Sequence, residues 1–161
     1  MPIESERILA EAEKRGYEYL RDHKTQACSQ TVLLVIQELF GPRDDLMIKA
    51  SGPLAGGSRS YSLCGALLGG VLALGMKYGS EQLDSLDALI KSYEPVKELY
   101  RRFEEEFGNR YCIGIIGVDL NNPVDRQRWV ETGGPEKCAR LTGKTARIVG
   151  EIILSGKYKE V

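Results

Sequence analysis

Four cysteines are the residues of this sequence best suited to chemistry. They are Cys28, Cys64, Cys112 and Cys138. No pair has the Cys-x-x-Cys spacing, so zinc ribbons, thioredoxin-type motifs and the common ferredoxin patterns are absent. A chain of 161 residues buries enough surface to fold without covalent staples. The four thiols are therefore candidates for a chemical role and not for a disulfide framework.

The rest of the composition excludes several other classes of functional site. A single histidine, His23, cannot supply a His-rich metal site, a Ser-His or Cys-His catalytic pair, or the repeated Glu-x-x-His of a di-iron site. The glycine-rich stretch 52–60 contains no G-x-x-x-x-G-K-[ST] phosphate loop. The 22 Lys and Arg residues are balanced by 23 Asp and Glu, a net charge of −1. Nucleic-acid binders and polybasic membrane proteins have an excess of positive charge, so we expect neither kind of partner.

The N-terminal residues are acidic and lack the apolar core of a secretory signal. The longest uncharged run, 60–76, reaches only the lower limit for a bilayer span and contains several glycines. This run predicts a buried helix of a soluble bundle. We therefore expect a cytoplasmic protein, in which thiols stay reduced and stable disulfides are rare.

The spacing of apolar residues predicts helices along almost the whole chain. Six segments carry this spacing: 4–21, 28–39, 64–78, a short stretch 83–90, a segment from Pro95 to Phe107, and 138–153. The stretch 51–60 is predicted as a loop, and 121–123 and 133–135 as turns. The β-branched residues of 111–120 suit either a helix or a short strand. The expected fold class is all-α, a single-domain bundle of about six helices over 1–161.

Capping signals place each cysteine in or beside the first turn of a helix. The predicted capping residues, in chain order, are Thr25, Ser60 or Ser62, Asn109 and Gly134. Unpaired backbone N–H groups and the helix dipole favour negative charge there, which lowers the pKa of a thiol. We therefore expect four thiolates, the form that acts as nucleophile and as metal ligand.

The residues alone leave three uses of these cysteines open. Four thiolates at one site match the ligand count of an iron–sulfur cluster or, ranked lower, of zinc. The thiols can instead work without metal, as dithiol/disulfide pairs that pass electrons to an unidentified redox partner protein. The third alternative is a non-catalytic helical interaction domain with inert buried cysteines. An electron carrier or redox sensor fits better than an oxidoreductase that turns over a small substrate, because no general base is identifiable.

The glycines after Cys64 admit two interpretations. Gly65, Gly69 and Gly70 form a small-residue face that predicts close packing of a neighbouring helix. Gly65 can also leave room for a cluster or for a partner cysteine beside Cys64. A homodimer formed through this glycine-rich helix belongs to the interaction-domain alternative.

The segment Cys64 to Gly69 (CGALLG) resembles a known family motif. It reproduces the C-G-A-x-x-G of the C_GCAxxG_C_C family of small redox proteins. The family pattern has one cysteine upstream and two single cysteines downstream, which are matched here by Cys28, Cys112 and Cys138. A glycine-rich stretch before the motif is present too, and the similarity extends over about residues 26–150.

The resemblance implies a helical protein with a redox function at these four cysteines. It would make 111–120 a helix. A related domain in split-Soret cytochromes associates an additional iron centre with cysteines, which implies a cofactor of the same kind here. No C-x-x-C-H occurs in this sequence, so covalent c-type haem is not expected.

Overall fold

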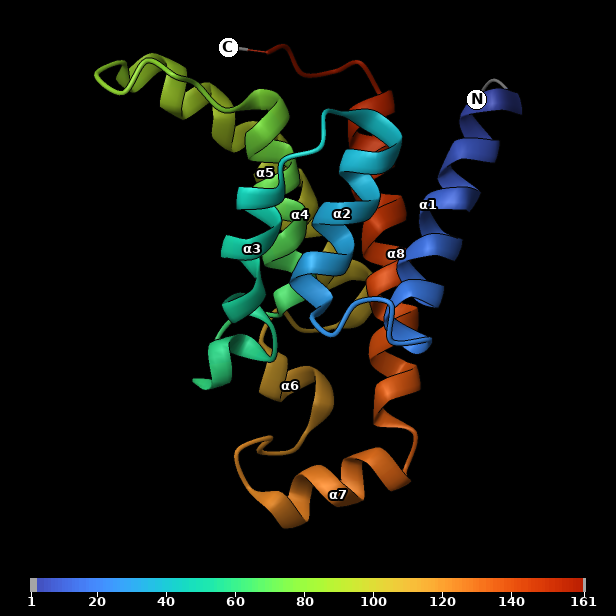
Figure 1. The fold of residues 1–161 in the computed structure, drawn as a ribbon. Coiled ribbons are helices and arrows are strands. Elements are labelled where there is room, and N and C mark those ends of the chain that lie inside the picture. Colours follow the sequence, from blue (N-terminus) through green and yellow to red (C-terminus); the bar gives the residue numbers. More distant parts are fainter. Residues whose placement is uncertain (1–2, 161) are drawn as a thin grey trace.

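A computed structural model describes residues 3–160, which fold into α-helices joined by short loops (Figure 1). The helices are α1 (Ile3–Arg21), α2 (Cys28–Phe40), α3 (Asp45–Ser51), α4 (Gly65–Tyr78), α5 (Leu86–Phe107), α6 (Cys112–Ile116), α7 (Pro123–Glu131) and α8 (Gly134–Leu154). Two single 3₁₀ turns, Gly52–Leu54 and Gly57–Arg59, lie between α3 and α4. Within residues 3–160 the only β-type pairing is an isolated bridge between Leu63 and Tyr111. The all-α class is confirmed, whereas the expected number of about six helices is too low, because the described residues contain eight α-helices.

Helix α5 is continuous where the sequence predicted a break at Pro95. The Ser85 side chain accepts a hydrogen bond from the Ala88 N–H (3.2 Å) and so starts the helix well before the proline. Pro95 is buried on the face that packs against the bundle. A proline inside a helix costs one backbone hydrogen bond, and burial of its ring offsets part of that cost. The predicted short helix and its successor are therefore one element.

Two further helices start at side-chain caps that lie in predicted loops and turns. The Asp44 side chain accepts from the Met47 N–H (3.0 Å) at the start of α3. The Asn122 side chain accepts from two N–H groups of α7, with Pro123 in the favoured first position. Residues 121–123 are thus a helix start as well as a turn. In the ambiguous stretch 111–120, α6 takes residues 112–116.

Helix α8 packs against α1, α2, α4 and α5 and forms the centre of the bundle (Figure 1). The core around it includes Leu33, Leu67, Leu99, Phe103 and Val149, all fully buried. No helix among residues 3–160 has both the length and the apolar character needed to span a membrane.

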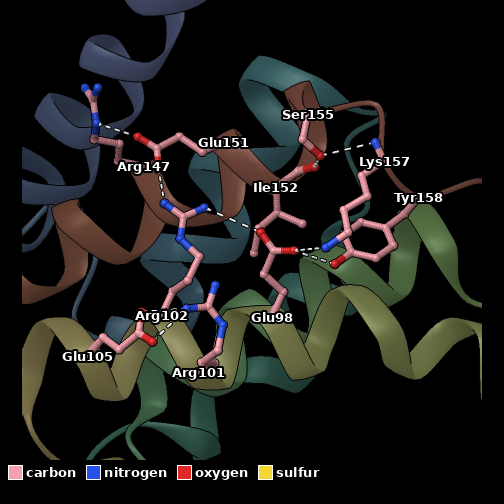
Figure 2. A network of polar contacts seen from close by, with 10 residues as sticks. All are labelled: Glu98, Arg101, Arg102, Glu105, Arg147, Glu151, Ile152, Ser155, Lys157 and Tyr158. Atoms are coloured by element: carbon pink, nitrogen blue, oxygen red, sulfur yellow. Dashed lines mark hydrogen bonds and ion pairs between the residues drawn. The ribbon is translucent and has the colours of Figure 1, made fainter.

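A network of charged side chains joins α5, α8 and the C-terminal segment (Figure 2). Glu98 of α5 accepts hydrogen bonds from Tyr158 (2.5 Å) and Lys157 (2.9 Å). One turn further along α5, Arg102 pairs with Glu151 of α8. Only 19% of the Glu98 side chain and 23% of that of Glu151 are exposed. These pairs are therefore screened by water less than ordinary surface pairs.

Glu151→Gln is expected to lower the free energy of unfolding by about 1–2 kcal/mol. Glu151 accepts from Arg102 and, at 2.9 Å, from Arg147, so the substitution removes a carboxylate shared by two half-buried guanidinium groups, while Arg147 keeps Glu6 and Arg102 keeps the more distant Glu98. The matched control is Glu105→Gln, because among residues 3–160 the ion pair of Glu105 is with the exposed Arg101 on the same helix. In urea unfolding, the control should change the free energy of unfolding by less than about 0.5 kcal/mol. Equal losses in the two variants would contradict this assignment.

Candidate four-cysteine site

All four cysteines lie at or near helix starts, although the predicted capping residues are not the ones used. Cys28 and Cys112 are the first residues of α2 and α6, and Cys64 occupies the position just before α4. Cys138 is the fifth residue of α8, slightly beyond the predicted first turn. The observed capping positions are Ala27, Cys64, Tyr111 and Gly133, and none of them supplies a side-chain hydrogen bond to its helix. Each start is therefore determined by tertiary packing and not by a polar cap.

A short backbone ladder holds Cys64 and Cys112 on neighbouring segments. Leu63 and Tyr111 form an antiparallel bridge, and each cysteine directly follows one of them. The N–H groups of Cys64 and Cys112 donate to carbonyls of the opposite segment, at 2.8 and 2.9 Å. The starts of α4 and α6 are thereby joined although they are far apart in sequence.

Two glycines of the C-G-A-x-x-G motif bring Cys28 to the same place. A Cβ atom on Gly65 would lie 2.7 Å from the Cys28 Sγ, and one on Gly69 would lie 2.4 Å from the Ser29 carbonyl oxygen. Real Cβ atoms do not come this close, so α2 can approach α4 only because both positions lack a side chain. Both interpretations of these glycines are confirmed: Gly69 allows close helix packing, and Gly65 leaves room for a partner cysteine beside Cys64.

Electrostatic coupling connects all four thiols, Cys138 included. A negative charge on Cys28 raises the pKa of Cys64, Cys112 and Cys138, and a charge on Cys112 raises that of Cys64 and Cys138. Each of the four sulfurs therefore lies within reach of the charge of at least one other. All four are free thiols. Residues 3–160 hold no group of three or more Cys, His, Asp or Glu side chains with the spacing of a metal-ion site.

The expectation of thiolates at the helix starts is wrong for the protein without cofactor. Burial raises the pKa of Cys112 to about 11 and that of Cys138 to about 12. Burial also raises the pKa of Cys28 and of Cys64, which is only 7% exposed, and a charge on Cys28 raises that of Cys64 further. Loss of hydration disfavours the charged thiolate more strongly than the helix start favours it. All four groups are therefore neutral thiols at pH 7.

The four sulfurs fall into two pairs with different surroundings. Backbone N–H groups near Cys28 and Cys64 lower the pKa of both thiols, and that of Ala66 acts on both. At the other two cysteines a nearby cation lowers the pKa of the thiol instead. This cation is Arg59 at Cys112 and Lys137 at Cys138. Oriented amides and cations both stabilise negative charge on sulfur. Each pair of cysteines therefore has neighbouring groups that favour its thiolate form.

A strained loop covers the Cys112 side of the site. Within 56–61, the non-glycine residues Ser58, Arg59 and Tyr61 have positive φ angles, a conformation that costs of order 1–3 kcal/mol each. The loop is held by hydrogen bonds from Arg59 to the Leu120 carbonyl (3.0 Å) and from Tyr61 to Asp119 (2.8 Å). The Gly56-Gly57 doublet was the one available sequence signal for this feature.

Fold and site together define an all-α protein in which the backbone ladder joins Cys64 to Cys112, Cys28 lies against Gly65, and the charges of Cys28 and Cys112 reach Cys138. A family model described as "Putative redox-active protein (C_GCAxxG_C_C)" matches residues 26–152. The chain belongs to this family, as the C-G-A-x-x-G motif indicated. Neither the search of curated proteins nor that of solved structures found a match to the chain.

Proposed function

We propose that Cys28, Cys64, Cys112 and Cys138 together ligate an iron–sulfur cluster that serves electron transfer or redox sensing. The observation that carries this proposal is the proximity of four thiols, one buried and three half-buried, that resist ionisation and repel one another once ionised. Cationic iron removes that repulsion, because it replaces the protons and neutralises the thiolates. When bound, such a cluster supplies one-electron transfer.

We rank a cluster above a single zinc ion as the occupant of the four-cysteine site. Four thiolates around zinc, with Zn–S about 2.3 Å, would have to lie about 4 Å from one another. No three donors within residues 3–160 are grouped as a single ion needs, yet all four thiols are electrostatically coupled. A [4Fe–4S] cluster binds each cysteine at a different iron and so accepts thiolates that are further apart.

The surrounding residues have their own roles in this proposal. The backbone N–H groups at Cys28 and Cys64 stabilise negative charge on sulfur, and such hydrogen bonds raise the potential of a cluster. Arg59 and Lys137 offset the charge of the other two ligands. Partial burial of the cysteines limits the access of water and oxidants to the sulfurs. Electrons would pass to or from a redox partner protein.

A thiol/disulfide protein without metal is the second candidate, and the ladder that joins Cys64 to Cys112 favours it. In that case two thiols become one disulfide and transfer two electrons and two protons to a disulfide of the partner protein. The attacking species in such an exchange is a thiolate. The raised pKa values of these thiols make them slow in this reaction at pH 7, which ranks it second.

Anaerobic purification followed by reconstitution with iron and sulfide separates the two candidates. A cluster protein is expected to show the broad visible absorption of sulfide-to-iron charge transfer, with iron and acid-labile sulfide in equal amounts. Cys64→Ser and Cys138→Ser should each lose most of that iron while retaining the helical circular dichroism. A colourless, iron-free protein after reconstitution would contradict the cluster. A wild-type protein that gains one disulfide with mild oxidant, and never iron, would establish the thiol/disulfide alternative.

A further inference from the structure

The loop 56–61, between α3 and α4, has a strained backbone, and we call it the lid loop. Its residues Ser58, Arg59 and Tyr61 have φ angles of 53°, 54° and 59°. Residues that carry a Cβ atom rarely adopt this left-handed conformation, so other contacts must hold them in it. The lid loop is therefore expected to change its conformation once those contacts are lost.

Three hydrogen bonds tie the lid loop to the segment between α6 and α7. The Arg59 guanidinium donates to the Leu120 carbonyl (3.0 Å), and the Asn121 side chain donates to the Arg59 carbonyl (3.0 Å). The Tyr61 hydroxyl donates to the Asp119 carboxylate (2.8 Å). Two of the three strained residues take part in these bonds, so backbone strain and hydrogen bonding act on the same loop in opposite directions.

The lid loop lies directly against Cys112. A Cβ atom on Gly57 would be 2.9 Å from the Cys112 Cβ, and the Cys112 N–H donates to the carbonyl of Ser62, just after the loop (2.9 Å). Cys112 also lines a small hollow together with Arg59 and Tyr61 of the loop and with residues of the segment between α6 and α7. A movement of the lid loop away from that segment would widen the hollow beside Cys112.

We propose that residues 56–61 are a lid that opens and closes over Cys112 and so controls how fast metal ions and thiol reagents in solution reach this thiol. The three hydrogen bonds hold the lid shut, and relief of the backbone strain favours its opening. Opening also removes part of the burial that disfavours the Cys112 thiolate, which is the form that reacts with both kinds of reagent. The inference concerns the cofactor-free protein and is independent of the proposed cluster.

The rate at which N-ethylmaleimide modifies Cys112 in the cofactor-free protein at pH 8 tests the lid, with each cysteine followed by peptide mass spectrometry. Tyr61→Phe removes one hydrogen bond and should raise the rate at Cys112 by about three- to tenfold. The rate at Cys138, which takes no part in the contacts that hold the lid loop, should stay unchanged. Tyr93→Phe is the matched control, because Tyr93 lies on α5 and is exposed to a similar degree, 47% against 52% for Tyr61.

Ser58→Gly tests the contribution of strain, with the opposite sign. Glycine adopts a φ angle of 53° without steric cost, and the three hydrogen bonds of the lid involve other residues of the loop. This variant should close the lid more firmly and slow the modification of Cys112 by at least about threefold.

Two results would overturn the proposal. In the first, Tyr61→Phe and Ser58→Gly both react at the wild-type rate, which would mean that neither the hydrogen bonds nor the strain controls access to Cys112. In the second, Tyr61→Phe speeds the modification of all four cysteines equally, which would indicate unfolding of the whole bundle in place of a local opening.

Discussion

Gly65→Ala is expected to lower the free energy of unfolding by about 1–3 kcal/mol. The new methyl group would lie 2.7 Å from the Cys28 Sγ and 2.8 Å from the Ala55 Cα, so that relief requires the start of α2 or the adjacent loop to move. The same movement carries Cys28 away from the other three thiols. Iron content after reconstitution should therefore fall several-fold, even under conditions in which the variant is fully folded. Urea unfolding and iron analysis measure the two effects separately.

Gly75→Ala is the control for this substitution. Gly75 lies in the same helix, α4, and a Cβ there would have no neighbour within 4 Å. Alanine at this position should raise the free energy of unfolding by about 0.5–1 kcal/mol, because it reduces the freedom of the unfolded chain. Iron content should stay at the wild-type level. If the two variants lose stability equally, the contact between Gly65 and Cys28 does not have the role assigned to it.

The cofactor-free protein is expected to lose stability steeply as the pH rises above about 9. A thiol in the unfolded chain has a pKa of about 8.5. Below that pH the folded and the unfolded chain both hold the proton, so the thiol does not change the free energy of unfolding. Above it the unfolded chain releases protons that the folded chain retains, because burial raises the folded pKa to about 11 at Cys112 and about 12 at Cys138. Each such thiol then costs about 1.4 kcal/mol per pH unit, until the folded pKa is reached.

Urea unfolding at pH 8, 9 and 10 measures this loss. The comparison is with the double variant Cys112→Ala/Cys138→Ala, in which other titrating groups such as tyrosines and lysines are retained. Between pH 9 and 10 the wild-type chain should lose about 2–3 kcal/mol more than the double variant, whatever their difference at pH 8. Parallel losses in the two proteins would show that these thiols titrate normally in the folded state.

Helix prediction succeeded where the signal is local. The periodic apolar residues of α2, α4 and α8 identify these helices, and Gly79 and Gly108 end helices where the sequence predicted an end. It failed at α5, because Pro95 is tolerated once Ser85 has started the helix and the ring is buried. Helix α7 was missed for a related reason: Asn122 and Pro123 suit a turn and a helix start equally well.

The sequence by itself determined the chemistry available to this protein. Four single cysteines, one of them in a C-G-A-x-x-G motif, identify the family, and they are the residues best suited to chemistry. Motif and periodicity together also determined the helical class, because both depend on neighbours along the chain.

Only the tertiary structure decided the state of those thiols. The helix dipole is a local effect and can be read from the chain, whereas desolvation depends on segments far apart in sequence, such as the loop 56–61 packed over α6. At all four cysteines desolvation is the larger effect, so groups expected as thiolates are neutral thiols until a cation or an acceptor of their electrons is present.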